Sequence, residues 1–363
     1  MAAEHEISRQ QDLYYADGSV VLFAAHAGQT HAFKVHKSVL GSHSRVFADM
    51  FALPSATELE TYDGVDSVNM PDDAKDLEDL LRALYYPATI LSMLENRNPL
   101  AAMKYRGIFM LSQKYFVRVL QKLLRARFRA DWPSTLQEWD KLMEQYDSLS
   151  ESTVPQHDAA SQFVDNRMLE PASAIRLARE ANLPEILPAA FYMLSTISPF
   201  MDFDSLRSGS PPTLTDSEGN VLVWVPGERT ARWGLLTPSD MMCLMRGKHY
   251  LTEFAQKIDQ EAGRCLCDTN HCVQYINRRK LLKGPTQDLL RVLNEIGSTV
   301  TPAHYSCHDA MHMLASRCIE ARSRLWENFC YYFGLPDIDD DQNDDDSDDV
   351  ALGDPEGAEF RNE

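Results

Sequence analysis

The sequence predicts an α+β N-terminal domain, in which a short three-stranded sheet is flanked by helices, followed by a mainly α-helical domain and a disordered acidic tail. β-rich runs are concentrated in the first 85 residues, apolar residues at helical spacing dominate from there to about residue 333, and no hydrophobic periodicity follows Pro336. A length of 363 residues suits about two domains. The expected divisions are a flexible N-terminus at 1–12, a first domain at 13–130, a helical domain at 131–336 with a loop insertion near 200–237, and a tail at 337–363.

The charge of the chain is strongly negative and uneven. The net charge is −19, and residues 337–363 contain ten Asp, three Glu and one Arg, a net of −12. Nucleic-acid binding requires a clustered basic surface, so we expect no direct nucleic-acid partner. Apolar residues make up 44% of the chain, which is enough for a buried core and excludes a wholly disordered protein.

The sequence gives no indication of a membrane or secretory segment. The longest uncharged stretch, residues 186–201, is interrupted by prolines and hydroxyl residues, and the N-terminus lacks an apolar signal core. The seven cysteines show no spacing typical of a disulfide framework. We therefore expect reduced thiols and a cytoplasmic or nuclear location.

The first domain is predicted to begin with a hairpin at 20–35, because two β-rich runs flank a turn at Gly28. Two short helices are expected next, at 38–42 and 45–51. Ser44 is a suitable N-cap for the second of them.

A strand at 65–70 follows and is expected to end at Pro71. Asp72 or Asp73 then caps an amphipathic helix. The apolar face of that helix carries Leu77, Leu80, Leu81 and Leu84.

Helical apolar spacing continues through most of the remaining chain. The insertion near 200–237 is the exception, because Ser, Pro and Gly are frequent there and the β-like run 221–225 suggests a small hairpin. The predicted helices lie near 100–113, 114–130, 134–147, 172–182, 185–197, 238–261, 269–283, 286–297 and 305–333. The aromatic residues and leucine predicted to form core rather than a cofactor site are Leu325, Trp326, Phe329 and Phe333.

The segment Phe33–Leu40 resembles the core signature of BTB/POZ domains, and the predicted order of strands and helices agrees with that fold. The resemblance also includes Ser44, Phe47, Met50, Phe51 and the pairs Tyr85-Tyr86 and Lys114-Tyr115. It implies a protein-interaction module that forms a two-fold homodimer through its N-terminal hairpin and first helices. The residues expected to contact a second copy are Val39, Leu40 and Val46.

Beyond residue 130, the chain resembles a large fungal, mushroom-type group of BTB proteins with a C-terminal helical region. This resemblance covers about residues 12–336. The segments that carry it are Trp132–Asp140, Ala174–Glu180, Leu183–Ala190, Leu236–Asp240, Arg246–Lys248 and Phe333–Pro336.

The expected function is a non-enzymatic interaction module without a cofactor, whose helical scaffold presents a site for an unknown protein partner on the insertion. One alternative is a substrate adaptor of a cullin-type ubiquitin ligase. That role uses a hydrophobic-x-acidic motif, which the aligned residues Met103–Arg106 do not match. A second alternative is a nuclear scaffold or transcription regulator, which the acidic tail permits. Nucleophile-elbow, dinucleotide and phosphate-loop motifs are absent, so no catalytic residue is predicted.

A basic stripe marks the predicted helix at 114–130, with an apolar side opposite that includes Phe116 and Leu123. The stripe is a candidate docking face for an acidic partner or for the polyaspartate tail, and a solvated outer helix face is the alternative. Its members are Lys114, Arg118, Lys122, Arg125 and Arg129.

The histidines and cysteines yield no predicted metal ligand, and zinc binding by the cysteine and histidine cluster is the less favoured alternative. His36 is expected to be a structural residue whose ring bonds to backbone at a strand–helix junction. Cys265 and Cys267 are closer in sequence than a zinc knuckle requires, and His308 and His312 lack the Glu of a zinc-protease motif. The other members of this cluster are His271, Cys272, His304, Cys307 and Cys318, and Cys318 is expected to pack as a small apolar group.

Overall fold

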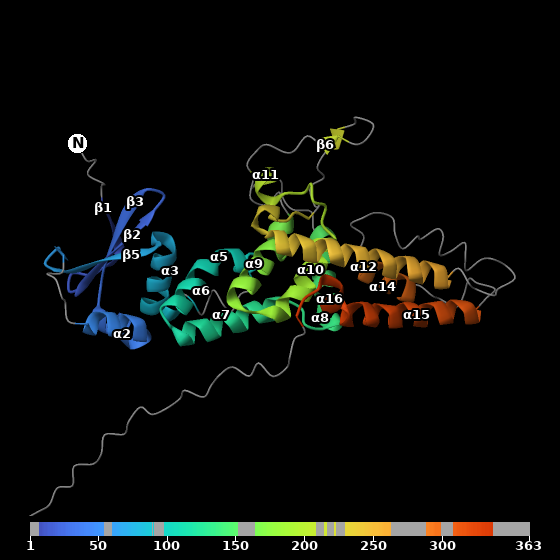
Figure 1. Ribbon diagram of the computed structural model, residues 1–363, viewed down its shortest axis with the longest axis horizontal. Helices are drawn as coiled ribbons and strands as arrows, with labels where there is room; N and C mark the ends of the chain where they lie inside the picture. The colour runs from blue at the N-terminus through green and yellow to red at the C-terminus, as the bar shows by residue number, and fades with distance from the viewer. Residues whose placement is uncertain are drawn as a thin grey trace, which may run out of the picture.

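The computed structural model is elongated, with a β-sheet at one end and long helices extending toward the other (Figure 1). The acidic tail and the helix predicted at 269–283 lie outside the residues that the structure describes. Those residues are 7–53, 60–88, 90, 98–151, 164–207, 214–215, 221–222, 229–262, 288–298 and 308–336.

The described strands of the N-terminal part form a five-stranded sheet with the order β1-β3-β2-β5-β4. These strands are β1 (Ile7–Tyr14), β2 (Val20–His26), β3 (Gln29–Val35), β4 (Thr61–Tyr62) and β5 (Val65–Asp73). β2 and β3 pair antiparallel along their whole length, which confirms the predicted hairpin. Its turn residues, Ala27 and Gly28, both have positive φ (49° and 84°), as tight two-residue hairpin turns require.

The sheet differs from the three-stranded prediction in three places. β4 is an additional strand, since no strand was predicted at 61–62. Residues 7–14, expected to be flexible apart from the last two, form β1, which pairs parallel with β3. Because β1 is an edge strand in which Leu13 is the one buried residue, it lacks the apolar alternation of a half-buried strand. β5 also continues through Pro71 to Asp73, where its pairing with β2 is irregular and does not require a proline N–H.

Three helices complete the first part of the chain: α1 (Lys37–His43), α2 (Arg45–Ala52) and α3 (Ala74–Tyr85). Ser44 caps α2 as predicted, accepting a 3.1 Å hydrogen bond from the N–H of Phe47. Asp73 caps α3 by accepting from the N–H of Lys75 at 2.9 Å. The predicted leucine face of α3 is buried against the sheet.

The rest of the described chain is largely helical, as expected. Its helices are α5 (Ala101–Lys104), α6 (Arg106–Lys114), α7 (Arg118–Asp131), α8 (Leu136–Glu151), α9 (Pro171–Ala181), α10 (Leu187–Ser195), α11 (Phe203–Arg207), α12 (Pro238–Ala262), α14 (Leu289–Ser298), α15 (His308–Glu327) and α16 (Phe329–Phe333). In the insertion, β6 (Leu214–Thr215) and β7 (Val221–Leu222) pair antiparallel and form the small hairpin that the β-like run suggested.

The helix predicted at 114–130 begins four residues later than expected, because its first residue, Lys114, belongs to the preceding helix. α6 ends at Lys114, and Phe116 adopts a left-handed φ of 52° before α7 begins at Arg118. Left-handed backbone is uncommon for residues other than glycine, and no Gly or Pro in the local sequence signals the break. Phe116 consequently points outward with 57% of its surface exposed, rather than packing on the apolar side of the helix.

The helical region has an aromatic core of its own. Trp139 on α8 meets Tyr192 on α10 edge-on, with ring centroids 5.2 Å apart, and Tyr192 stacks on Phe329 of α16 at 4.5 Å. Leu325, Phe329 and Phe333 are buried, which confirms their prediction as core.

Two motifs that are distant in sequence meet where α12 contacts α16. A Cβ added at Gly247 would lie 2.0 Å from the ring of Phe333, so only glycine allows this approach. One at Gly334 would lie 2.8 Å from the Arg246 guanidinium. Arg246–Lys248 and Phe333–Pro336 are therefore two sides of one contact.

Among the described helices, none combines the length and the apolar composition needed to cross a lipid bilayer.

Candidate functional site

The residues predicted to mediate self-association lie on α1 and α2. These helices pack closely, because a Cβ added at Gly41 would lie only 3.5 Å from Ala48. Val39 and Val46 are half-buried and keep part of their surface exposed. Leu40 is 0% exposed and lies within the core of its own chain. Val39 and Val46 thus remain accessible to a second copy, and Leu40 supports them from inside.

The α1–α2 pair is anchored to the end of α6 through Tyr115. The Ser44 hydroxyl, which caps α2, donates to the Tyr115 carbonyl at 2.5 Å. The Tyr115 ring stacks on Phe47 at 4.5 Å, and its hydroxyl donates to Asp72. Lys114 pairs with the other oxygen of Asp72 at 2.5 Å. Burial and the hydrogen bond to Asp72 raise the pKa of Tyr115, so its phenol stays protonated and keeps this bond.

His36 lies at the strand–helix junction as expected, but its ring contacts side chains rather than backbone. Its Nδ1 lies 3.1 Å from the Tyr85 hydroxyl, and its Nε2 lies 3.3 Å from Asp17. The backbone N–H of His36 also donates to Tyr85 at 2.8 Å. The structural role stands, and the expectation of backbone partners for the ring was wrong.

The five residues of the predicted basic stripe do not share one helix. Lys114 ends α6 and is engaged by Asp72, whereas the other four residues lie on α7. Arg118 and Lys122 are on the exposed side of α7.

Two residues of the stripe contact the helical region instead of facing solvent. Arg125 donates to the carbonyl of Ala181, the last residue of α9, at 2.7 Å. Arg129 pairs with Glu185 in the 3₁₀ turn that precedes α10. A cation at a helix C-terminus is favoured by the carbonyl groups that lack partners there. These two arginines therefore attach α7 to the rest of the chain.

A third connection of this kind joins α6 to α9. Arg106 donates to both oxygens of Glu180, at 2.5 and 2.7 Å, and Arg176 donates to Glu180 at 3.1 Å. Burial acts to raise the pKa of Glu180, but the hydrogen bonds from the two arginines outweigh it and hold the pKa below its ordinary value. The carboxylate is therefore charged at neutral pH and joins both helices.

A cavity of about 680 Å³ lies at the same junction, lined by residues of α3, α5, α6, α9 and the 233–235 turn. Burial raises the pKa values of Asp76 and Asp79 in its wall. The hydroxyl of Ser173 is buried and has no hydrogen-bond partner among the described residues. The arginines of the wall form ion pairs with neighbouring carboxylates, so their guanidinium groups are already engaged.

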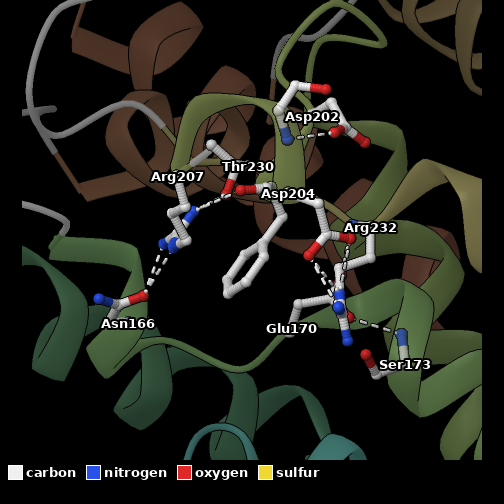
Figure 2. A network of polar contacts seen from close by, with 10 residues as sticks. Asn166, Glu170, Ser173, Asp202, Asp204, Arg207, Thr230 and Arg232 are labelled. Atoms are coloured by element: carbon white, nitrogen blue, oxygen red, sulfur yellow. Dashed lines mark hydrogen bonds and ion pairs between the residues drawn. The ribbon is translucent and has the colours of Figure 1, made fainter. Parts of the chain in front are cut away.

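A polar network holds the base of the insertion (Figure 2). Arg207 on α11 pairs with Asp165 at 2.7 Å, and the N–H of Thr230 donates to the same carboxylate at 3.1 Å. Arg232 donates to both oxygens of Asp204, at 2.7 and 2.9 Å. Residues near the two ends of the insertion are thereby held side by side, and the N–H of Arg232 donates to Glu170 just before α9.

The cysteine and histidine cluster falls mostly beyond the described residues. Cys318 is buried, and burial raises the pKa of its thiol to about 11, as expected for a cysteine that packs as an apolar group. Where the structure describes side chains, no three His, Cys, Asp or Glu residues converge on a metal site. Outside the described residues lie Cys265, Cys267, His271, Cys272, His304, Cys307 and the side chains of His308 and His312.

Sequence reasoning missed the ties between the two parts of the chain and the cavity beside them. Arg106 and Glu180 are 74 residues apart, and Arg125 and Ala181 are 56 apart. Sequence periodicity detects faces of single helices, so it carries no signal for such pairs.

Residues 19–145 match the family model of the BTB/POZ domain. The matched segment begins just before β2 and ends within α8, beyond the boundary expected at residue 130. No curated protein matches the chain, and no solved structure does.

Proposed function

We propose that this chain, whose N-terminal part is a BTB domain, is a non-enzymatic interaction module that self-associates as a homodimer through α1 and α2. BTB domains are protein-interaction modules that commonly self-associate and are generally without enzymatic activity. On this proposal, the helical region is the scaffold that presents a partner site.

The exposed apolar surface of α1 and α2 carries the proposal. Val39 and Val46 are half-buried there, and Leu53, the residue after α2, is 70% exposed. A two-fold dimer places one patch against its own copy, so a single small apolar face can serve both protomers. Stable interfaces bury about 1,200–2,000 Å² in total, which is more than these three residues provide. Neighbouring surface of the domain, including β1, would complete the interface.

The ties between the domain and the helical region support the scaffold role. Arg106, Arg125 and Arg129 each join a helix of the BTB domain to α9 or to the turn that follows it. A partner site on the helical region would therefore have a defined position relative to the dimer axis. The network at the base of the insertion fixes where that loop emerges.

The motifs that extend past the BTB domain support membership of the mushroom-type fungal group. The contact of Gly247 with Phe333 brings two of those motifs together in this chain. We place the protein in the cytoplasm or nucleus on the basis of its cysteine usage. Imaging of the tagged full chain would test that location, and secretion of the protein would contradict it.

Sedimentation velocity of the full chain tests the proposed interface. Replacing both Val39 and Val46 by Asp puts two charges into the contact, so the dimer is expected to weaken at least tenfold. Ile319→Asp is the matched control, because Ile319 is an exposed apolar residue on α15. Circular dichroism verifies that each variant remains folded. A dimer that is unaffected by the paired change, yet folded, would place the interface elsewhere.

A further inference from the structure

We propose that the chain's own acidic tail, residues 337–363, docks on the outward face of α7. This docking is intramolecular, and it does not depend on the self-association proposed above.

The first observation is an exposed apolar ridge, formed by Phe116, Val119 and Leu123. These side chains are 57%, 72% and 38% exposed, respectively. The buried side of α7 is a different one, made by Leu120, Leu124 and Phe128. The helix therefore has apolar residues on two faces, and the described structure covers only one of them. Grouped exposed apolar side chains of this kind are typical of a docking surface.

Backbone strain at the start of the ridge agrees with such a role. Phe116 has a φ of 52°, an unfavourable conformation for a bulky residue. That conformation turns a large aromatic side chain to the surface instead of into the core. Strain of this type is found preferentially at functional positions.

The second observation is a basic row that runs beside the ridge. At 3.6 residues per turn, Arg118 and Lys122 form a row next to that of Val119 and Leu123. α7 carries five cations and a single acidic residue, Asp131, in a chain whose net charge is −19. Arg118 has no hydrogen-bond or ion-pair partner among the described residues. The exposed face is thus apolar on one side and positive on the other.

The tail has the complementary chemistry. Residues 337–349 include nine Asp, which match the basic row in charge. Apolar residues follow directly at Val350 and Leu352, with Phe360 further on, and these match the ridge. An acidic run followed by apolar residues is what a face with adjoining basic and apolar rows would bind.

The tail also starts close enough to reach this face. It follows Pro336, and Phe333 just before it stacks on Phe191 of α10 at 5.6 Å. Arg129, near the end of α7, pairs with Glu185 immediately before α10. An extended chain spans at most about 3.3–3.6 Å per residue, so 27 tail residues exceed the length of α7 several-fold. A tethered segment has an effective concentration on the order of mM, which favours the chain's own tail over a free acidic partner.

Carbodiimide cross-linking of the full chain tests the docking directly, because this reagent joins carboxylates to lysine amines that are in contact. Tail carboxylates are expected to cross-link to Lys122 more than to Lys257. Lys257 is the matched control, since it is exposed on α12 and lines a groove with Tyr332, close to where the tail begins. Equal or greater cross-linking to Lys257 would overturn the proposal.

Variants separate the apolar and the charged contributions. Replacing Val119 and Leu123 by Ser is expected to reduce the Lys122 cross-link at least threefold, whereas Ile319→Ser on α15 leaves it unchanged. About 1 M salt, where the Debye length is near 3 Å, is expected to abolish it. Two results would contradict docking on this face. One is loss of the Lys122 cross-link in Ile319→Ser, and the other is a Lys122 cross-link that persists both in high salt and in the double variant. In a mixture of ¹⁴N- and ¹⁵N-labelled chains, cross-links between the two labels would overturn the intramolecular form.

A competition experiment gives an independent readout. A fluorescent polyaspartate peptide is the probe, and its anisotropy is measured with the full chain at low salt. Replacing the nine Asp of 337–349 by Asn removes the competing charge, so the probe is expected to bind at least tenfold more tightly. Unchanged affinity would show that the tail does not occupy the basic row.

Discussion

Tyr115 shows how one side chain can organise the BTB domain. Its carbonyl accepts from the cap of α2, its ring stacks on Phe47 and its hydroxyl donates to Asp72. The Asp72 side chain is only 8% exposed, so it depends on Tyr115 and Lys114 for its hydrogen bonds. Sequence resemblance identified the Lys114-Tyr115 pair but not its partners, which lie more than 40 residues away.

Tyr115→Phe is expected to lower the free energy of unfolding by about 1–3 kcal/mol, because it leaves a nearly buried carboxylate without one of its donors. The stacking on Phe47 is retained, so the change isolates the hydrogen bond. The measurement is the urea midpoint at constant m-value. Tyr331→Phe is the control, since Tyr331 is exposed on α16, and a loss as large in that variant would contradict the assignment.

Glu180→Gln tests the tie between α6 and α9 through its pH dependence. The folded pKa of Glu180 lies below its ordinary value of 4.5, so the unfolded chain binds more protons in acid. The stabilisation is therefore complete above pH 4.5 and is lost as the pH falls through the lower, folded pKa. Thermal unfolding is expected to show that the variant is less stable than the wild type at pH 7. The difference between their unfolding temperatures is expected to narrow in acid.

The matched control for this variant is Glu295→Gln, which removes the acid of an exposed i, i+4 pair with Arg291. Exposed pairs of this type contribute about 0.3–0.5 kcal/mol, so a smaller effect is expected. A difference in unfolding temperature between wild type and Glu180→Gln that does not change with pH would show that Glu180 stabilises the chain by some means other than its charge.

At the scale of elements, the contact of α12 with α16 depends on a missing side chain. Gly247→Ala would place a methyl group 2.0 Å from the buried ring of Phe333. Overpacking of this kind typically costs about 1–3 kcal/mol, so a lower unfolding midpoint is expected. Gly234→Ala is the control, because no atom lies within 4 Å of its Cβ position. Equal stability of the two variants would contradict the close packing of these helices.

Elements with strong local signals could be predicted from the sequence, and elements without them could not. The 20–35 hairpin and α3 were correct because their periodicity and caps are local. β1 was missed because an edge strand with exposed polar residues lacks alternation. The boundary between α6 and α7 was placed at 113/114 instead of at Phe116, because no Gly or Pro in the local sequence marks the residue with positive φ. That boundary separates Lys114 from the other members of the basic stripe.

At the scale of the whole molecule, arginines join the α+β BTB domain to a largely helical region. The architecture followed from composition and periodicity, since β-rich and helical patterns occupy different parts of the sequence. The junction between the two parts could not be predicted in this way. Arg125 and Arg129 belong to the predicted basic stripe, and periodicity does not show that their partners lie on α9 and the following turn. The self-association surface on α1 and α2 stays a prediction, with Val39 and Val46 half-buried and Leu40 internal.

The most direct test of self-association is light-scattering mass of the full chain on size-exclusion chromatography, alone and with the N-terminal domain of a cullin scaffold. A homodimer that ignores the cullin domain is expected, with twice the chain mass of 41.2 kDa and no change when that domain is added. A stoichiometric complex with the cullin domain would favour the ligase-adaptor alternative. A monomer at every concentration measured would contradict self-association through α1 and α2.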